Sequence, residues 1–332
     1  MTIVKHKTLG QIIGFRSFVF GIILAIGVYL AILILGDWDT LLINLFRVNP
    51  LILVLAILLS LTNYIFRFFK WHLFTRSLNL EIPLRDNFTI FMAGLSLAIT
   101  PAKVGESIRA FLLQQKKVSD LSRGLASTFS ERLIDLLAVT ILAIIGVFAL
   151  DLRPSLDYLP LLLFILFGIF FGVLIFLIDP LYALFSRVFN TGPWAKFGAR
   201  IDRFRTDVVF TFQYRVFIGA LGFGIIGWAC EGIGFMLIAN DLGVLVTLET
   251  AIFVYATSSL LGAISFLPGG LGVTEGSIEI FLSDLLSTEP PIAGALIILT
   301  RVCTLWFGVA IGLVFLGISN RSLSGLDNVE RD

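Results

Sequence analysis

Long runs of apolar residues alternate with short polar segments along most of the chain. The uninterrupted runs cover residues 18–36, 50–69, 124–150, 158–178, 216–240 and 292–318. Each has about the length that an α-helix needs to cross the hydrocarbon core of a bilayer. The pattern predicts an all-α polytopic membrane protein with six spanning helices, the first of which is a retained helix rather than a cleaved signal peptide.

Two further apolar segments are interrupted near their middle. Residues 88–113 contain "TPAKVGE" at 100–106, and residues 250–286 contain "LPGGLGVTE" at 267–275. Proline removes a backbone donor, and polar backbone at membrane depth is tolerated only where protein or a water-filled cavity satisfies it. We therefore predict two re-entrant hairpins of broken helices. The expected helix breaks are Pro101 and Gly105 in the first segment, and Pro268, Gly269, Gly270 and Gly272 in the second.

Composition supports a membrane protein and excludes several other classes. Of the 332 residues, 58% are hydrophobic and 14% are charged, against ~25% charged residues in an ordinary globular domain. The net charge of +1 gives no reason to expect a nucleic-acid partner. Two cysteines, Cys230 and Cys303, lie in apolar runs, and two histidines, His6 and His72, are far apart. We expect no metal site and no cofactor.

The distribution of cations sets the expected orientation. With both broken segments as hairpins and the N-terminus in the cytoplasm, seventeen lysines and arginines, Lys70 among them, fall on the cytoplasmic side. Only Arg47 and Arg153 fall outside. If residues 88–113 crossed once instead, the cations of the following loops would move outside, against the positive-inside rule. Both termini are therefore predicted to be cytoplasmic, in the cytoplasmic membrane of a prokaryote.

Residues 181–215 form the one substantial cytoplasmic segment in this arrangement. Its apolar residues recur at helical spacing and cations lie between them: Phe197, Ile201, Phe204 and Val208, with Lys196, Arg200, Arg203 and Arg205. This pattern is typical of an amphipathic helix on the anionic inner leaflet. A structural linker helix is the alternative.

The two halves of the chain correspond to each other. In each, a span leads to a broken hairpin and then to a span that carries an arginine, and 26 residues separate Glu106 from Arg132 and Glu275 from Arg301. The hairpins would enter from opposite sides, as in inverted-topology repeats of secondary transporters. We predict a single membrane domain over 1–332. Its parts are an N-terminal helix and loop (1–49), a first repeat (50–150), a linking helix with the amphipathic segment (151–215), an inverted second repeat (216–318) and a cytoplasmic tail (319–332).

Eleven charged residues lie inside the apolar segments. The cations are Arg67, Lys103, Arg109, Arg132 and Arg301, and the acids are Glu106, Glu131, Asp135, Glu231, Glu275 and Glu279. Because each charge facing lipid would cost ~2.5–3.5 kcal/mol, they are expected to face one another or water. Either they form a substrate site or they are inert ion pairs that hold the hairpins in the bundle.

The breaks suggest how these charges are used. A half-helix that begins near Lys103 would point free N–H groups and its positive end toward Arg109 and Arg132, which predicts an anion site for a phosphate. The second half-helix begins near Thr274 and is followed by two acids at i, i+4 spacing. These acids are expected to pair with Arg301, or to accept protons, as one half of a gate. The "PGGLG" stretch is not a nucleotide loop, since no GK[ST] follows it.

Four motifs carry a family resemblance: "YIFRFFKWHLF", "TPAKVGESIRAFLL", "SERLIDLL" and "LPGGLGVTEGSIEIF". In this order they resemble the flippase-like membrane family named for the transmembrane part of lysylphosphatidylglycerol synthase, over about residues 50 to 315. The resemblance implies a lipid-translocating helical bundle, whose members are proposed to move aminoacylated phospholipids or polyprenyl-phosphate-linked glycans. The residues that match its motifs are Arg67, Pro101, Gly105, Glu106, Arg109, Glu131, Arg132, Asp135, Pro268, Gly269, Gly270, Gly272 and Glu275.

The sequence therefore predicts a flippase or transporter of an anionic lipid, with membrane lipids as its substrate. We expect no enzyme: the chain shows no nucleophile next to a base, and without an aminoacyl-transfer domain it is not expected to lysylate lipids alone. Two alternatives stay open. One is a membrane-embedded transferase that uses the paired acids on a lipid phosphate, and the other is a non-transporting partner of a lipid-modifying enzyme such as a lipid-glycan synthase.

Overall fold

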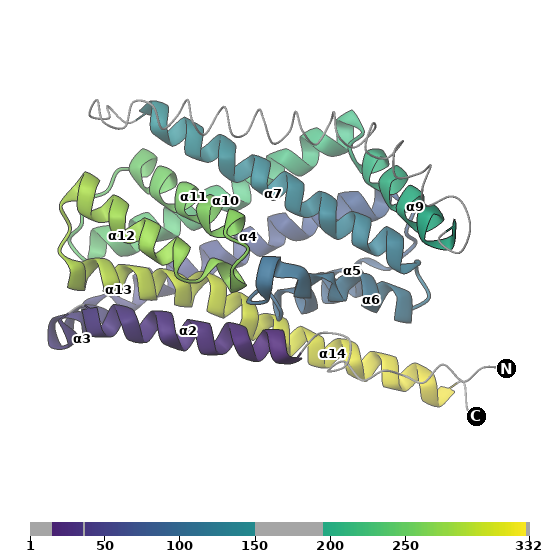
Figure 1. Cartoon of the computed structure of the whole chain (residues 1–332), viewed down its shortest axis with the longest axis horizontal. Helices are drawn as coiled ribbons and strands as arrows, with labels where there is room; N and C mark the ends of the chain where they lie inside the picture. Colours follow the sequence, from purple (N-terminus) through teal and green to yellow (C-terminus); the bar gives the residue numbers. More distant parts are fainter. Residues whose placement is uncertain (1–14, 36, 150–194, 330–332) are drawn as a thin grey trace.

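The computed structural model describes residues 15–35, 37–149 and 195–329 (Figure 1). Within these ranges all regular structure is helical. In chain order the elements are α2 (Phe15–Leu35), α3 (Trp38–Arg47), α4 (Pro50–Ser77), α5 (Leu84–Leu95), η1 (Pro101–Ser107), α6 (Ile108–Gln115), α7 (Leu121–Ala149), α9 (Ala195–Thr211), α10 (Tyr214–Asp241), α11 (Leu248–Ile264), η4 (Pro268–Gly270), α12 (Val273–Leu286), α13 (Pro290–Arg301), the π-helical η5 (Val302–Trp306) and α14 (Phe307–Val329).

Four helices of the described part are long and apolar enough to cross a membrane. They are α4, α7, α10 and the continuous stretch Pro290–Ser319 formed by α13, η5 and the first part of α14. These four confirm the spans predicted at 50–69, 124–150, 216–240 and 292–318. The span predicted at 18–36 corresponds to helix α2. This helix counts as a candidate span only together with α3, and the two helices are bent by 106° relative to each other. The span predicted at 158–178 lies outside the described residues.

Helices α4 and α10 pack along each other in opposite directions. At one end, the backbone N–H of Asn49 donates to Asp241 Oδ2 at 2.7 Å, so the start of α4 meets the end of α10. At the other end, Phe74 of α4 shares an apolar cluster with Ala220 of α10. Asn49 also caps α4 by accepting from the N–H of Leu51 at 2.9 Å, with Pro50 in the first turn, as expected of a helix start.

The first broken segment folds back on itself. Its two half-helices, α5 and α6, pack against each other, and an ion pair of 3.3 Å between Lys116 and Asp86 joins the end of α6 to the start of α5. Asn87 of α5 accepts a hydrogen bond from Trp71 Nε1 at 2.7 Å. The open end of this hairpin therefore lies beside the C-terminal part of α4.

The second broken segment also forms a hairpin, from α11 and α12. Phe253 near the start of α11 contacts Phe281 near the end of α12, with ring centroids 5.1 Å apart. The N–H of Val246, just before α11, donates to Asn240 Oδ1 at 2.8 Å, which ties this open end to the C-terminus of α10. Since α4 and α10 are antiparallel, the open ends of the two hairpins lie at opposite ends of the bundle.

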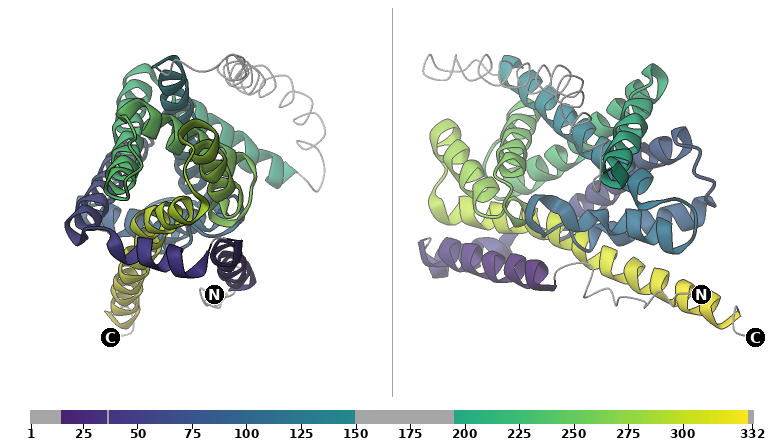
Figure 2. Two further views of the ribbon diagram at one scale, coloured as in Figure 1. Left: turned by 90° about the vertical axis from the view of Figure 1, so that its left-hand side faces the viewer. Right: turned by 45° about the vertical axis from the view of Figure 1, so that its right-hand side comes forward.

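The closed ends of the hairpins meet in the interior. Elements η1 and η4 contact each other, and a Cβ added to Gly269 would lie 3.7 Å from Ile99 Cα. Helix α2 runs beside α13, and α14 extends beyond the other helices toward the C-terminus (Figures 1 and 2). The breaks predicted from proline and glycine are thus placed against each other.

Helix α9 covers most of the described part, 195–215, of the predicted amphipathic segment 181–215. It packs on α7, where Phe204 contacts Phe129 at 5.6 Å between ring centroids and Thr211 shares a hydrogen bond of 2.7 Å with Ser130. Val208 is buried. This part of the apolar face is therefore covered by protein, as the linker-helix alternative expects, and contact with the anionic leaflet stays a prediction.

Candidate functional site

Seven charged side chains from α4, η1, α6 and α7 meet in one place, which we name the charge cluster. Its members are Arg67 and Lys70 of α4, Glu106 of η1, Arg109 of α6, and Glu131, Arg132 and Asp135 of α7. Six of the seven are buried, and the side chain of Arg132 is 21% exposed. The cluster lies where the first helix break packs against two spanning helices.

Arg109 is enclosed at the centre of the cluster. Its Nη2 donates to Glu106 Oε2 at 2.8 Å, and its Nη1 donates to Glu131 Oε2. The guanidinium lies 4.4 Å from the ring centroid of Phe91 and 5.3 Å from that of Trp71, a cation–π arrangement. With two carboxylates bound and two aromatic rings beside its guanidinium, Arg109 holds the first hairpin to α7.

Arg132 and Arg67 form the looser part of the cluster. Arg132 Nη2 is 2.6 Å from Glu131 Oε1, 2.9 Å from Asp135 Oδ2 and 3.3 Å from Glu106 Oε2. Arg67 lies at ion-pair distance from the same three acids, 3.5–3.9 Å away. Its Nε and Nη2 have no hydrogen-bond partner among the described residues. Arg67 is therefore a buried cation with unused donors.

Lys70 was predicted to be one of the cytoplasmic cations, and this prediction was wrong. The side chain is fully buried and forms an ion pair with Asp135. Its spacing of three residues from Arg67 places both on one face of α4, which was the signal available in the sequence. Trp228 of α10 was also missed: its Nε1 donates to Asp135 Oδ1 at 3.0 Å, and Lys103 Nζ lies 6.0 Å from its ring centroid.

The charge cluster carries an excess of positive charge. Four cations face three carboxylates, and Lys103 adds a fifth cation at its border, over Trp228. The Nε atoms of Arg109 and Arg132, like that of Arg67, have no hydrogen-bond partner in the described part of the chain. Buried donors of this kind need a partner, and arginine donors match the oxygens of a phosphate.

The first half-helix supplies less than the sequence predicted. The N–H of Lys103 donates to the carbonyl of Thr100 at 2.9 Å, and the N–H of Gly105 donates to the hydroxyl of Thr100 at 2.7 Å. The expectation that these N–H groups are free was wrong, because the carbonyl and the hydroxyl of Thr100 accept them. Pro101, predicted as a helix break, is the first residue of η1. The positive character of the site therefore comes from side chains rather than from the helix end.

A second ion pair lies at the second helix break. Arg301 Nε donates to Glu275 Oε1 at 2.6 Å, and its Nη2 donates to the carbonyl of Gly269 at 2.6 Å. Glu275 also accepts the N–H of Gly272 at 2.7 Å, so it caps its own half-helix. The predicted contact between Glu275 and Arg301 is confirmed, and both residues are buried.

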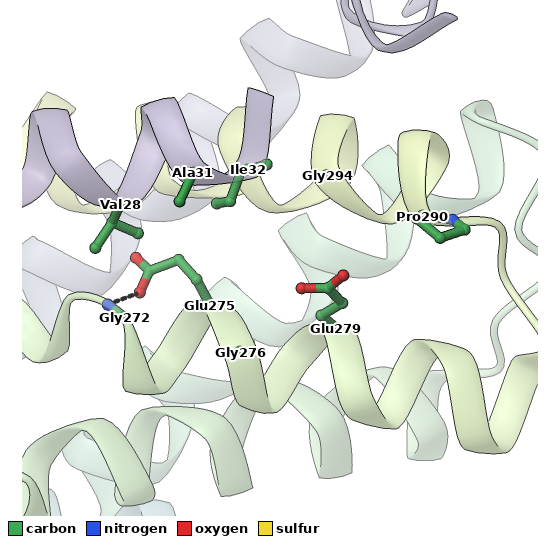
Figure 3. Close-up of a pocket in the computed structure, with 9 residues that line it drawn as sticks. All are labelled: Val28, Ala31, Ile32, Gly272, Glu275, Gly276, Glu279, Pro290 and Gly294. Carbon is green, nitrogen blue, oxygen red and sulfur yellow. Dashed lines mark hydrogen bonds between the residues drawn. The ribbon is translucent and has the colours of Figure 1, made fainter. Parts of the chain in front are cut away.

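Glu279 is placed differently from Glu275. It is exposed and, within the described residues, forms no ion pair with Arg301, so the expectation that both acids pair with this arginine was wrong. Glu275 and Glu279 both line, from one face of α12, a cavity of about 220 Å³ between α12, α2 and α13 (Figure 3). Gly294 on α13 lines the same cavity.

The backbone around the second break requires glycine. Gly269, Gly270 and Gly272 have φ of 59°, 68° and 85°, a region that side chains rarely occupy. A Cβ added to Gly270 would also lie 2.7 Å from Thr274 Oγ1 and 3.1 Å from Gly262 Cα. Directly after Arg301, the helix becomes π-helical over Val302–Trp306, an irregularity that is frequent at functional sites.

Comparison with known proteins identifies the family of the chain. Residues 22–312 match the family described as the lysylphosphatidylglycerol synthase TM region. The chain belongs to this family. The match spans all seven residues of the charge cluster as well as Glu275 and Arg301 of the second ion pair.

Three relatives, each named only as a UPF0104 membrane protein, come from archaea. The protein of Methanothermobacter thermautotrophicus is 22% identical over 304 residues, which cover 84% of this chain and 88% of the relative. That of Methanocaldococcus jannaschii is 26% identical over 229 residues, covering 68% and 94%. That of Pyrococcus horikoshii is 22% identical over 305 residues, covering 83% and 89%. Family membership identifies a multi-pass membrane protein.

Proposed function

We propose that the protein is a lipid flippase or transporter, which moves an anionic, phosphate-bearing lipid across the cytoplasmic membrane of a prokaryote. The lipid is a phospholipid or a polyprenyl-phosphate-linked lipid. The observation that carries the proposal is the charge cluster, which holds more cations than carboxylates and is mostly buried. Donors on Arg67, Arg109 and Arg132 have no hydrogen-bond partner among the described residues.

A phosphate fits this surplus chemically. Leaving a buried donor unsatisfied costs about 1–3 kcal/mol, and more where the group is charged. Guanidinium donors bind phosphate oxygens in pairs. A phosphate next to Arg67 and the partly exposed Arg132 would use those donors and reduce the excess positive charge. The enclosed Arg109 would then serve as the fixed support of the site.

The arrangement of the hairpins supports transport. We propose six spans, two re-entrant hairpins and an inverted-topology repeat, with both termini in the cytoplasm. Support comes from the open ends of the hairpins at opposite ends of the bundle and from their contact in the interior. In secondary transporters with such repeats, substrates bind between the repeats near the midplane.

Buried polar side chains also occur outside the charge cluster. Four of them have no hydrogen-bond partner among the described residues: Asn63 on α4, Thr257 and Ser258 on α11, and Thr300 on α13. Buried polar groups of this kind cost free energy unless water or a ligand satisfies them. They suit the passage of a headgroup while its acyl chains stay in lipid.

Flipping requires no covalent chemistry, and the geometry gives a transferase little support. Glu106, Glu131 and Asp135 each form ion pairs with at least two cations, which leaves none of these three carboxylates poised as a free base. A partner of a lipid-glycan synthase would need the helical shell but not the buried charges. Contact of 181–215 with the anionic inner leaflet, and of the chain with a lipid-modifying enzyme, remain compatible with transport.

Reconstitution into liposomes tests the proposal. Fluorescent phosphatidylglycerol should exchange between leaflets faster with the protein than in protein-free liposomes, whereas a fluorescent neutral glycolipid with the same acyl chains should not. Equal rates for both lipids, or no rate above the protein-free control, would contradict the proposal. Covalent conversion of the lipid, followed by mass spectrometry, would support the transferase instead.

A further inference from the structure

Glu231 is a buried acid that the charge cluster and the second ion pair do not use. It lies on α10, is 6% exposed, and accepts a hydrogen bond of 2.5 Å from the hydroxyl of Tyr255 on α11. Among the residues that the structure describes, it forms no ion pair. In this it differs from Glu106, Glu131 and Glu275, each of which binds an arginine.

Glu231 lies within electrostatic reach of both halves of the site. Its charged and titratable neighbours are Tyr255 on α11, Tyr64 and Arg67 on α4, Lys103 in η1, Arg301 on α13 and the adjacent Cys230 on α10. On the side of α7, Trp228 connects Tyr255 to Asp135: the two rings lie 6.5 Å apart, and the indole donates to Asp135 at 3.0 Å.

The charge state of Glu231 therefore depends on cations that it does not touch. A buried carboxylate without an ion-pair partner favours its neutral form, and nearby positive charge favours the ionised form. Arg67 and Lys103 supply that positive charge only while no anion neutralises them. A phosphate at the charge cluster would remove this support and favour a proton on Glu231.

We infer that Glu231 is the proton-binding site that couples lipid movement to proton movement. The inference rests on the proposed function and adds the coupling ion to it. A proton adds to the Glu231 carboxylate when an anionic headgroup occupies the charge cluster, and it leaves when the headgroup leaves. A monoanionic headgroup and one proton then move together without net charge. By linkage, acid pH strengthens headgroup binding to the same extent that headgroup binding strengthens proton binding.

The test uses the whole protein in liposomes with fluorescent phosphatidylglycerol, whose phosphodiester does not titrate over the pH range of the assay. Lipid exchange is followed together with a pH dye inside the liposomes, with and without a pH gradient. In the wild type, a gradient should accelerate exchange toward the less acidic side, and lipid movement should carry protons. Glu231→Gln should lose both the proton movement and the pH dependence while it still binds the lipid.

Two further variants separate coupling from folding. Tyr255→Phe keeps the carboxyl but removes the donor that stabilises its ionised form, so coupling should persist with the pH profile shifted toward higher pH. Asp284→Asn removes an exposed acid of α12 and should leave exchange and its pH dependence unchanged. If Glu231→Gln fails to insert or to stay monodisperse, the test of the coupling role rests on whether the pH profile of exchange shifts in Tyr255→Phe.

The outcomes distinguish this inference from the function on which it rests. No exchange of phosphatidylglycerol by the wild type overturns both. Exchange without proton movement, exchange driven by sodium instead, or an unchanged pH profile in Glu231→Gln or in Tyr255→Phe overturns the coupling role of Glu231 and leaves the transporter proposal standing.

Discussion

Arg301 and Glu275, 26 residues apart in the chain, are joined by a hydrogen bond of 2.6 Å at the second helix break. Arg132 and Glu106 have the same separation, and their closest atoms lie 3.3 Å apart at the first break. The surroundings differ, because Arg132 is shared among three carboxylates and Arg301 binds one carboxylate and one carbonyl. The second pair has fewer partners to lose and is the easier of the two to open.

The opposite entry of the hairpins can be tested by accessibility. In a background without Cys230 and Cys303, single cysteines at Ser119 and Glu289 lie in the loops after the first and second hairpins. Ser119→Cys should label with a membrane-impermeant maleimide from the cytoplasm, and Glu289→Cys from outside. Labelling of both positions from the same side would contradict the inverted repeat and the proposed topology.

The two cluster arginines should respond differently to truncation. Arg109→Ala leaves Glu106 and Glu131 buried with a partner removed, which typically costs about 3–5 kcal/mol. Arg132 has a partly exposed side chain, and Glu131 and Asp135 keep Arg109 and Lys70 as partners. Arg132→Ala should therefore fold and lose about tenfold or more in lipid exchange, the equivalent of one charged hydrogen bond. Thermal unfolding in detergent and the liposome assay measure the two effects.

The control for these arginines is Arg123, whose pair with Asp207 spans 3.7 Å and whose side chain is half exposed. Exposed pairs contribute about 0–1 kcal/mol, so Arg123→Ala should fold and transport normally. An Arg132→Ala protein that exchanges lipid as fast as the control would make the charge cluster structural. That result would favour the ion-pair alternative over a substrate site.

The pair of Lys70 and Asp135 provides a test of the buried network itself. Lys70→Met removes one partner of Asp135 and should lower the free energy of unfolding by about 3 kcal/mol. This is the lower end of the cost of breaking a buried pair, because Arg132 stays 2.9 Å from the same acid. The double variant Lys70→Met with Asp135→Asn should recover part of that loss. Arg203→Met, at an exposed site 3.9 Å from Asp120, should change stability by about 1 kcal/mol or less. Additive losses in the double variant would show that the two side chains are not coupled.

Hydrophobic pattern and backbone chemistry explain what the sequence could predict. Long apolar runs located α4, α7 and α10, since a spanning helix needs a continuous stretch of about 20 apolar residues. Proline and glycine also predicted both helix breaks, because their effects are local. Proline removes a backbone donor and glycine permits positive φ, whatever the tertiary packing. The contact of Glu275 with Arg301 followed from comparing the two halves, which needs no knowledge of packing.

The missed residues depend on tertiary packing. Lys70 stands at the end of an apolar run, where a cation normally reaches the interface, and it is buried only because α7 brings Asp135 to it. In the sequence, Trp228 and Tyr255 resemble lipid-facing aromatic residues. In the structure, their polar atoms donate hydrogen bonds to Asp135 and Glu231. The hydroxyl of Thr100 satisfies a backbone donor five residues on, a local alternative that residue spacing alone does not distinguish from a free helix end.

The last prediction concerns the second break, where Glu275 both caps α12 and binds Arg301. Gln at this position can accept from Gly272 or from Arg301 but loses the charge, while Arg301 keeps its bond to Gly269. If the pair is a gate, Glu275→Gln should bind lipid but exchange it more slowly. Liposome exchange, paired with lipid binding in detergent, measures both effects.

Gly270→Val is the companion variant, because it forces a branched side chain into a positive-φ position against Thr274 and Gly262. It should impair both binding and exchange, since the break itself is distorted. Gly222→Ala on α10, where an added Cβ meets nothing within 4 Å, is the matched control and should behave as the wild type. A Glu275→Gln protein with the wild-type exchange rate would reduce this acid to a helix cap, and the gate would have to lie elsewhere.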